Sequence, residues 1–276
     1  MQFFSRSELE LIGKNGVRVF NGQLDNKIPF TASRILSSFW ICTKPTGVDV
    51  AENLIRDGFW ESWITLWISN NVKPGSICID AGANYGYFTF FLSNHGCQVV
   101  AIEANKDLIP FLNKSIELNG AADRVMIINK AITDRSWQTV TLNVNEEMIG
   151  SSTLFPMDGA RAIDIDSISL NDVLFLKPHV DFIKMDIEGA EEKAWLGMQK
   201  LWEVNRNCTL LMEFSPIFYT NFGRDLYDSI SRDFIIHYVD TDGIDKPVSG
   251  FSFFENDLNE FKMLAIRKKD SDYFKK

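Results

Sequence analysis

The chain has 276 residues, of which 45% are hydrophobic and 24% charged, so we expect a folded protein and exclude a disordered one. This length suits one large domain with an N-terminal extension. The formal net charge of −9 disfavours nucleic acid as a partner, because an acidic surface repels phosphate backbones. The sequence has no run of roughly 20 apolar residues that would span a membrane. It begins without a signal-peptide layout, so a cytoplasmic protein is expected.

Residues 1–58 show weak periodicity and are expected to form an N-terminal elaboration, either a cap or a substrate region. Within it, the apolar runs 17–20 and 28–30 flank Asp25 and Asn26, a pattern that is typical of a hairpin. Residues 59–270 are expected to form the main, cofactor-binding domain.

From about residue 74 onward, short apolar runs alternate with helical patterns, which predicts βαβ units and a largely parallel sheet. In chain order, the pattern predicts strands at 76–80, 98–103, 125–129, 139–144, 162–165, 180–186, 208–214, 234–239 and 261–266. Helices are expected from about residue 86, at 106–118 and at 189–202. The alternation breaks between 139 and 165, where an irregular insert carries Gly150, Ser151 and Ser152.

The turn from Asp80 to Gly86 has the spacing Asp-x-Gly-x-x-x-Gly, with Asn84 at the position where a dinucleotide fingerprint needs its second glycine. This departure favours a nucleoside ligand that lacks a pyrophosphate, and S-adenosylmethionine is one. Glu103 ends the next strand 21 residues after Gly82 and could accept hydrogen bonds from ribose hydroxyls. The structural alternatives are a turn-forming or helix-capping role for Asp80 and a solvated strand end for Glu103.

Three segments, 80–88, 102–104 and 183–191, resemble the FkbM family of S-adenosylmethionine-dependent methyltransferases. The similarity extends over about residues 58–268, and the segment Lys184-Met185-Asp186-Ile187-Glu188-Gly189-Ala190-Glu191 is its most distinctive part. The resemblance implies an α/β, Rossmann-like class I methyltransferase fold. It implies a mostly parallel seven-stranded sheet with an antiparallel final strand.

The resemblance also implies a cofactor site in which the turn contacts the methionine part of S-adenosylmethionine, Glu103 holds the ribose and the end of the third strand borders the adenine. The implied cofactor-binding residues are Asp80, Gly82, Ala83, Asn84, Tyr85, Gly86, Glu103, Ala104, Asn129, Ala131 and Asp186. Glu61 belongs to an aromatic-Glu element that precedes the turn, and it could approach the cofactor's ammonium group. An exposed helix glutamate is the alternative for Glu61.

Methyl transfer from a sulfonium needs a nucleophile held in line and, for a hydroxyl, a base. Asp186 is the first choice for a base or substrate-binding carboxylate. Lys184, two residues earlier, is expected to orient Asp186 or a substrate oxygen, or else to form a structural ion pair with Asp186 or Asp181. Glu188 and Glu213 are the other catalytic candidates, although Glu188 could instead serve the following helix N-terminus. Asp186, Glu188 and Glu213 could together hold Mg²⁺, but their spacing in the sequence does not require a metal, so no metal is expected.

The resulting hypothesis is an O-methyltransferase acting on a hydroxyl of a sugar, glycan or secondary metabolite, with S-adenosylhomocysteine as the product. N-methylation of a small amine and a non-catalytic cofactor-binding module are the alternatives. Asn84 disfavours an NAD-dependent oxidoreductase. Acceptor selection is expected to depend on the insert, residues 1–58 and the loop at 240–254, because loops carry specificity over a fixed scaffold.

Overall fold

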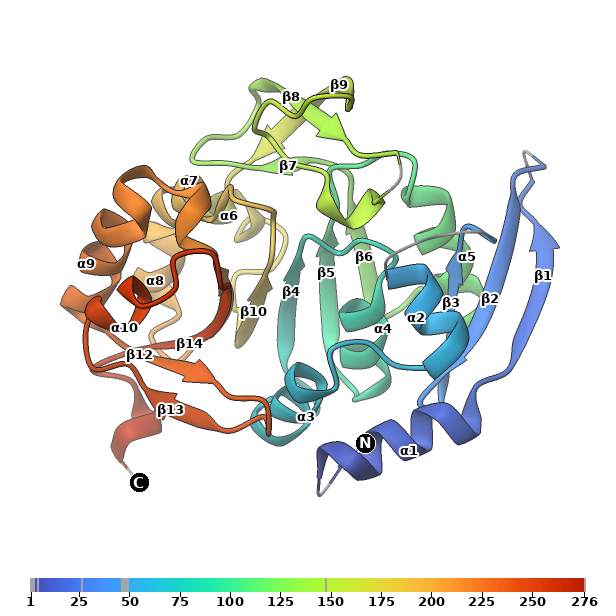
Figure 1. Ribbon diagram of the computed structural model, residues 1–276, viewed down its shortest axis with the longest axis horizontal. Helices are drawn as coiled ribbons and strands as arrows, with labels where there is room; N and C mark the ends of the chain where they lie inside the picture. The colour runs from blue at the N-terminus through green and yellow to red at the C-terminus, as the bar shows by residue number, and fades with distance from the viewer. Residues whose placement is uncertain (1–2, 4, 26, 46–49, 147, 276) are drawn as a thin grey trace.

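An eight-stranded mixed sheet of order β13-β12-β14-β11-β10-β4-β5-β6 forms the centre of the chain (Figure 1). The computed structural model describes residues 3, 5–25, 27–45, 50–146 and 148–275. The strands of this sheet are β4 (Ile77–Ala81), β5 (Gln98–Ile102), β6 (Val125–Ile128), β10 (Phe182–Met185), β11 (Thr209–Phe214), β12 (Phe234–Val239), β13 (Asp245–Pro247) and β14 (Lys262–Lys268).

Strand directions follow the predicted Rossmann-like pattern. The strands from β11 through β10, β4 and β5 to β6 are parallel, and β14 lies antiparallel between β11 and β12. The α/β fold class and the antiparallel final strand are therefore confirmed. The three-residue β13 extends the sheet by one strand beyond the seven that were expected.

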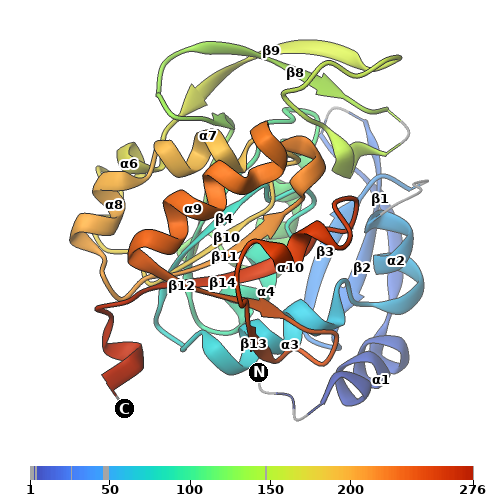
Figure 2. The ribbon, with the colours of Figure 1, turned by 60° about the vertical axis from the view of Figure 1, so that its left-hand side comes forward.

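Alternating strand residues build two hydrophobic cores, one on each face of the sheet. Cys78, Val99 and Phe182 point to the face covered by α3 (Ser62–Asn71), α4 (Tyr87–Asn94) and α5 (Ile109–Asn119). Ile79, Val100 and Ile183 belong to the other core, beneath α6 (Leu170–Val173), α7 (Glu191–Leu196), α8 (Gln199–Val204), α9 (Arg224–Asp233) and α10 (Ser252–Glu255). Figure 2 shows these two layers on opposite sides of the central strands.

The predicted single helix at 189–202 is wrong, because the chain forms α7 and α8 with a break at Gly197. The Gly197 carbonyl accepts the Asn171 amide at 2.8 Å, and a Cβ at Gly197 would lie 2.5 Å from the Thr133 carbonyl oxygen. The backbone of Thr133 and Asn171 therefore lies against Gly197, where the helix is interrupted. The helix predicted at 106–118 begins later, at Ile109.

The N-terminal elaboration consists of α1 (Arg6–Gly16), a sheet of β1 (Val19–Gln23), β2 (Pro29–Ile35) and β3 (Phe39–Thr43), and α2 (Val50–Asp57). β1 and β2 pair antiparallel, which confirms the predicted hairpin; Asn26 of its connection lies outside the described residues. β3 packs on α5, where the Cys42 amide donates to Ser115 Oγ at 2.9 Å. This sheet therefore shares its hydrophobic core with α4 and α5.

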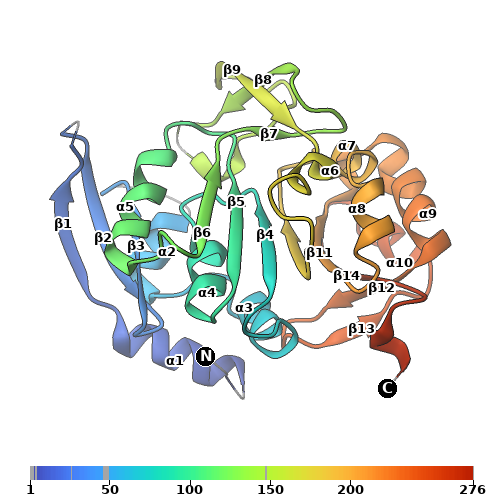
Figure 3. The ribbon, with the colours of Figure 1, turned by 180° about the vertical axis from the view of Figure 1, so that it is seen from behind.

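The irregular insert forms a third sheet from β7 (Ala131–Ile132), β8 (Thr139–Val144) and β9 (Arg161–Ile168), with the short helix η1 (Ile149–Ser151) between β8 and β9. It lies across the carboxyl ends of β4, β5 and β6, as the opposite views in Figures 1 and 3 agree. Three short helices complete the fold, η2 (Pro216–Phe218), η3 (Thr220–Gly223) and η4 (Asp272–Lys275). Among the described residues, none of the helices combines the length and apolar character that a membrane crossing needs.

Candidate active site

A cavity of about 350 Å³ opens at the carboxyl ends of β4, β5, β10 and β11, beneath the insert. In open α/β sheets, ligands bind at this end of the strands. The cavity brings together most of the residues singled out from the sequence: Glu61, Gly82, Ala83, Asn84, Tyr85, Glu103, Ala104, Ala131, Lys184, Asp186, Glu188 and Glu213. Asp80, Gly86 and Asn129 are not part of its lining.

The glycine-rich turn needs both of its glycines for close backbone packing. Gly82 has a φ of +84°, and a Cβ there would lie 1.8 Å from the Asp186 carbonyl oxygen, so β4 and β10 meet too closely for a side chain. Gly86 has a φ of +90° and precedes α4. The amides of Gly82 and Ala83 both donate to the Ile102 carbonyl at 3.0 Å, which fixes the turn against β5.

Asp80 and Asn129 support the site from behind its surface. Asp80 is 1% exposed and accepts hydrogen bonds from the hydroxyl and the backbone amide of Thr89 in the first turn of α4. It therefore contacts the start of this helix, although the N-cap residue itself is Gly86. Asp80 Oδ1 has no hydrogen-bond partner among the described residues. Asn129 Nδ2 donates to the carbonyls of Glu103 at 2.8 Å and Ala104 at 3.1 Å, which holds the end of β5 in place.

Glu103 is buried, which corrects the alternative of a solvated strand end. Its Oε2 accepts the Asn84 amide at 2.7 Å, and its Oε1 accepts the Asn105 amide at 2.7 Å. Burial outweighs these hydrogen bonds and raises the pKa of Glu103 to about 7. Since a carboxylate oxygen has two acceptor sites, each oxygen retains one for a ligand.

Glu61 precedes α3 rather than lying within an exposed helix, so that alternative is also wrong. Its backbone is left-handed, with a φ of +37°, and it lines the cavity. Glu61 Oε2 is buried without a hydrogen-bond partner in the described part of the chain. Burial raises the pKa of Glu61 to about 7, although the nearby Lys184 ammonium acts in the opposite direction. An unpartnered buried carboxylate oxygen is costly unless a ligand satisfies it.

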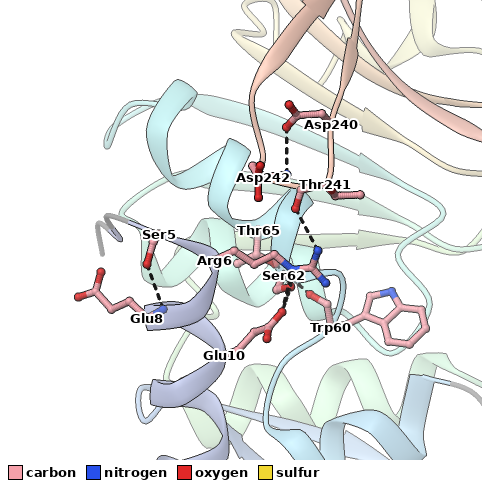
Figure 4. A network of polar contacts seen from close by, with 10 residues as sticks. All are labelled: Ser5, Arg6, Glu8, Glu10, Trp60, Ser62, Thr65, Asp240, Thr241 and Asp242. Atoms are coloured by element: carbon pink, nitrogen blue, oxygen red, sulfur yellow. Dashed lines mark hydrogen bonds and ion pairs between the residues drawn. The ribbon is translucent and has the colours of Figure 1, made fainter.

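A polar network from α1 holds the start of α3, and thereby Glu61 (Figure 4). Ser62 Oγ donates to Glu10 Oε1 at 2.6 Å and accepts from Arg6 Nε at 2.8 Å. Arg6 also pairs with Glu10 at 2.8 Å and donates to the Thr241 carbonyl at 3.0 Å. The N-terminal helix therefore reaches both the residue after Glu61 and the connection that follows β12.

Lys184 is the central cation of the site. Its side chain is 3% exposed, and its Nζ lies 2.8 Å from Asp186 Oδ2 and 4.9 Å from the centre of the Phe88 ring. In the sheet it is level with Asp80 of β4. Burial disfavours the charged form, but the carboxylates of Asp186 and Asp80 outweigh burial and raise the Lys184 pKa above its ordinary value. Lys184 therefore stays charged at neutral pH.

Asp186 directly follows β10, and Glu213 lies near the end of the neighbouring parallel strand β11; a hydrogen bond joins their side chains. Burial would raise the pKa of Asp186, but the Lys184 ammonium outweighs it and holds this pKa below its usual range. Burial, with the charge of Asp186, raises the pKa of Glu213 to about 10. At neutral pH Asp186 is therefore ionised and Glu213 protonated. Ser215 Oγ donates to Glu213 Oε1 at 2.6 Å.

The alternative ion pair between Lys184 and Asp181 is not formed. Asp181 instead accepts the Ile77 amide at 2.8 Å and pairs with His179 at 2.7 Å. Nor does Glu188 lie in a helical first turn, because α7 begins only at Glu191. Glu188 has a φ of +53°, lines the cavity, and its carbonyl accepts Thr153 Oγ1 of the insert at 2.7 Å.

Some lining residues were not singled out from the sequence. The apolar and aromatic ones are Val50, Leu108, Ile132, Leu142, Leu154 and Phe261, while Trp60, Tyr87 and Phe88 belong to the recognised segments but were given no role. Lys130 also lines the cavity, beside the predicted Asn129 and Ala131. Buried Glu191 accepts the Ile187 amide at 2.8 Å and Tyr219 Oη at 3.0 Å, so it supports the loop that carries Glu188. Apolar residues such as these resemble core residues in sequence, and their positions at the site depend on the folded chain.

Acidic side chains line this site, but in the described part of the chain they are not arranged as a metal-binding group. Across the described ranges, no group of three His, Cys, Asp or Glu side chains is placed to hold a metal ion.

The strand order, the antiparallel β14 and the cavity above the glycine-rich turn form a Rossmann-like fold of the kind expected for a class I methyltransferase. Residues 80–240, more than half of the chain, match the family model of the methyltransferase FkbM domain, and the chain belongs to this family. Its methyl donor is accordingly S-adenosylmethionine. The family expected from the sequence is confirmed. No curated protein matches the chain.

Several solved structures are similar at low sequence identity. A TehB-like SAM-dependent methyltransferase from Corynebacterium glutamicum is 14% identical, with a TM-score of 0.45 over 79% of this chain and 94% of that one. TYW2 from P. horikoshii, solved in complex with MeSAdo, is 12% identical, with a TM-score of 0.45 over 92% and 72%. The C-terminal domain of precorrin-6Y C5,15-methyltransferase from Rhodobacter capsulatus is 10% identical, with a TM-score of 0.42 over 76% and 88%.

Proposed function

We propose that this protein transfers the methyl group of S-adenosylmethionine to a hydroxyl of an uncharged small molecule, such as a sugar, glycan or secondary metabolite. The observation that carries this proposal is the Lys184–Asp186–Glu213 arrangement at the cavity. It places an ionised carboxylate beside a neutral one, where an acceptor hydroxyl could lose a proton.

The residues present fit S-adenosylmethionine. The buried, unpartnered Glu61 Oε2 suits the ammonium of the methionine part, and Glu103 retains acceptor sites for the ribose hydroxyls. Ala131, at the start of β7, lines the cavity, which supports its expected place beside the adenine. When bound, the cofactor supplies an activated methyl group on a sulfonium. The protein's own task is to position the acceptor and remove its proton.

Asp186 would accept the proton of the acceptor hydroxyl. Lys184 keeps the Asp186 carboxylate ionised before transfer, because its ammonium lies 2.8 Å away. Protonated Glu213 donates to Asp186 and fixes its orientation, and Ser215 in turn fixes Glu213. Glu188 is left to contact a further hydroxyl of the acceptor. Lys184 is already paired with Asp186, and the acidic Glu188 lines the same cavity, so we expect an uncharged acceptor to be preferred over an anionic one.

Residues 1–58 are proposed to act as a cap and substrate region for the domain formed by residues 59–270. In support, Val50 of α2 lines the cavity, and α1 reaches Ser62 beside Glu61. The insert contributes Ser151, Ser152 and Leu154 to the same cavity. We propose that these two segments together select the acceptor.

The test is methyl transfer from labelled S-adenosylmethionine to a panel of polyols, glycosides and small amines. We expect transfer to hydroxyl compounds, and Asp186→Asn should lower kcat at least 100-fold while calorimetric affinity for S-adenosylhomocysteine changes less than threefold. Asp270→Asn, at an exposed position after β14, is the matched control. Transfer to amines alone, or full activity of Asp186→Asn, would contradict the proposal.

A further inference from the structure

Two phenylalanine rings lie exposed beside the cavity mouth. Phe155, in the insert, is 39% exposed, and Phe218, at the end of η2, is 47% exposed. Both residues adjoin Gly189, where a Cβ would lie 2.8 Å from Cε2 of the Phe155 ring and 3.0 Å from Phe218 Cβ. Gly189 directly follows Glu188, and Leu154 directly precedes Phe155; both of these neighbours line the cavity. Both phenylalanines are therefore neighbours of the segment that carries Glu188 at the cavity.

Hydrogen bonds fix the backbone of both phenylalanines. The Phe155 amide donates to Thr153 Oγ1 at 3.2 Å, and the Phe155 carbonyl accepts Asn143 Nδ2 at 2.8 Å. The Phe218 amide donates to the Ser215 carbonyl at 3.0 Å. Ile217, 53% exposed, adjoins Phe218 in the chain. Single exposed apolar side chains are common on protein surfaces, whereas a group of them next to a binding cavity can mark a ligand contact.

We propose that the acceptor carries an apolar body, an alkyl chain or a ring system, which lies on Phe155 and Phe218 while its hydroxyl reaches Asp186. This proposal rests on the proposed methyl transfer to a hydroxyl. Because Phe155 and Phe218 adjoin the cavity, the group that covers them is better explained as part of the substrate than as a protein partner. The surface is also small, since a stable protein interface needs roughly 1,200 Å² or more.

The experiment uses the full chain saturated with S-adenosylhomocysteine and measures the binding of two probes by calorimetry. The probes are n-octyl β-D-glucoside, below its micelle concentration, and methyl β-D-glucoside, which share a head group and differ in the apolar chain. We expect the octyl compound to bind at least tenfold more tightly. Phe155→Ser and Phe218→Ser should each remove most of this preference while leaving S-adenosylhomocysteine affinity unchanged.

The matched control is Phe175→Ser. Phe175 is 87% exposed and follows α6, and nearby Lys177 contacts Gln98 at the start of β5, the opposite end of that strand from the cavity. Equal affinity of the wild type for the two probes would overturn the proposal. A preference for the octyl compound that Phe155→Ser and Phe218→Ser both retain would also overturn it. A wild-type protein that is dimeric in light scattering and that dissociates in the two variants would also overturn it, because the rings would then serve self-association. Wild-type protein that fails to bind S-adenosylhomocysteine would overturn the proposed function itself.

Discussion

Ser62 Oγ lies 2.6 Å from Glu10 Oε1, so a residue of α1 holds the first residue of α3 across 52 positions of sequence. This hydrogen bond is the largest cause of the lowered Glu10 pKa, and Arg6 adds to it. The same hydrogen bond bears on Glu61, which directly precedes Ser62. Glu61 has a left-handed backbone and lines the cavity. The N-terminal elaboration therefore takes part in shaping the cofactor site.

Ser62→Ala removes this hydrogen bond without changing the cavity lining. Because Glu61 would lose its fixed backbone position, we expect affinity for S-adenosylhomocysteine to fall about threefold to tenfold, corresponding to a typical hydrogen-bond contribution of about 1 kcal/mol. Calorimetry checks this, with Ser231→Ala as the control, because the Ser231 hydroxyl donates to the Asp228 carbonyl within α9. Unchanged affinity would show that α3 holds Glu61 without help from α1.

Glu61→Gln tests the proposed ammonium contact. The pKa of Glu61 is raised to about 7, so the fraction of charged carboxylate increases as pH rises through neutrality. Cofactor affinity of the wild type should therefore increase between pH 6 and pH 8. Glu103 titrates in the same range, so the variant should retain only part of this dependence. A variant with wild-type affinity and the same pH profile would exclude Glu61 from cofactor binding.

Glu103→Ala should weaken cofactor binding by about 1–3 kcal/mol, the scale of a lost hydrogen bond to a charged group. The loss has two parts, because Glu103 also holds the amides of Asn84 and Asn105. Glu103→Gln separates them, since its single carbonyl oxygen can replace only one of the two acceptors. We expect calorimetric affinities in the order wild type, Gln, Ala, and equal values would refute the ribose assignment.

Glu213→Gln distinguishes a neutral hydrogen-bond donor from a charged group. Glutamine keeps a donor toward Asp186, so we expect kcat to fall less than tenfold, whereas Glu213→Ala should lose about 100-fold. With its pKa near 10, wild-type Glu213 ionises only in alkaline solution, where its charge would repel Asp186. The wild-type rate should therefore decline as pH rises toward 10, and the Gln variant should lack this decline. A Gln variant as inactive as the Ala variant would assign Glu213 a charged role.

Chelation tests the expectation of a metal-independent reaction. EDTA should leave the methyl-transfer rate unchanged, because Lys184 already supplies the positive charge beside Asp186. The measurement is the initial rate before and after chelator treatment. Lost activity that Mg²⁺ restores would show that Asp186, Glu188 and Glu213 serve a cation instead.

The sequence by itself determined the sheet and the turn, because both follow from local chemistry. Short, nearly continuous apolar runs predict strands that are buried on both faces, and the glycines at 82 and 86 satisfy left-handed backbone at close contacts. The sequence determined the ends of the helices less well than it determined the strands. The break at Gly197 depends on the Thr133 carbonyl, which is distant in sequence.

Only the tertiary structure decided how the charged groups combine. Asp186 and Glu213 become neighbours because Met185 is level with Met212 in the parallel register of β10 and β11. Glu61 approaches Lys184 because the network around Arg6 places the start of α3. A carboxyl group's pKa depends on its burial and on the charges around it, and neither quantity is encoded in neighbouring residues. Residue types therefore indicated a methyl donor, while their arrangement decided which carboxyl group is ionised and which retains its proton.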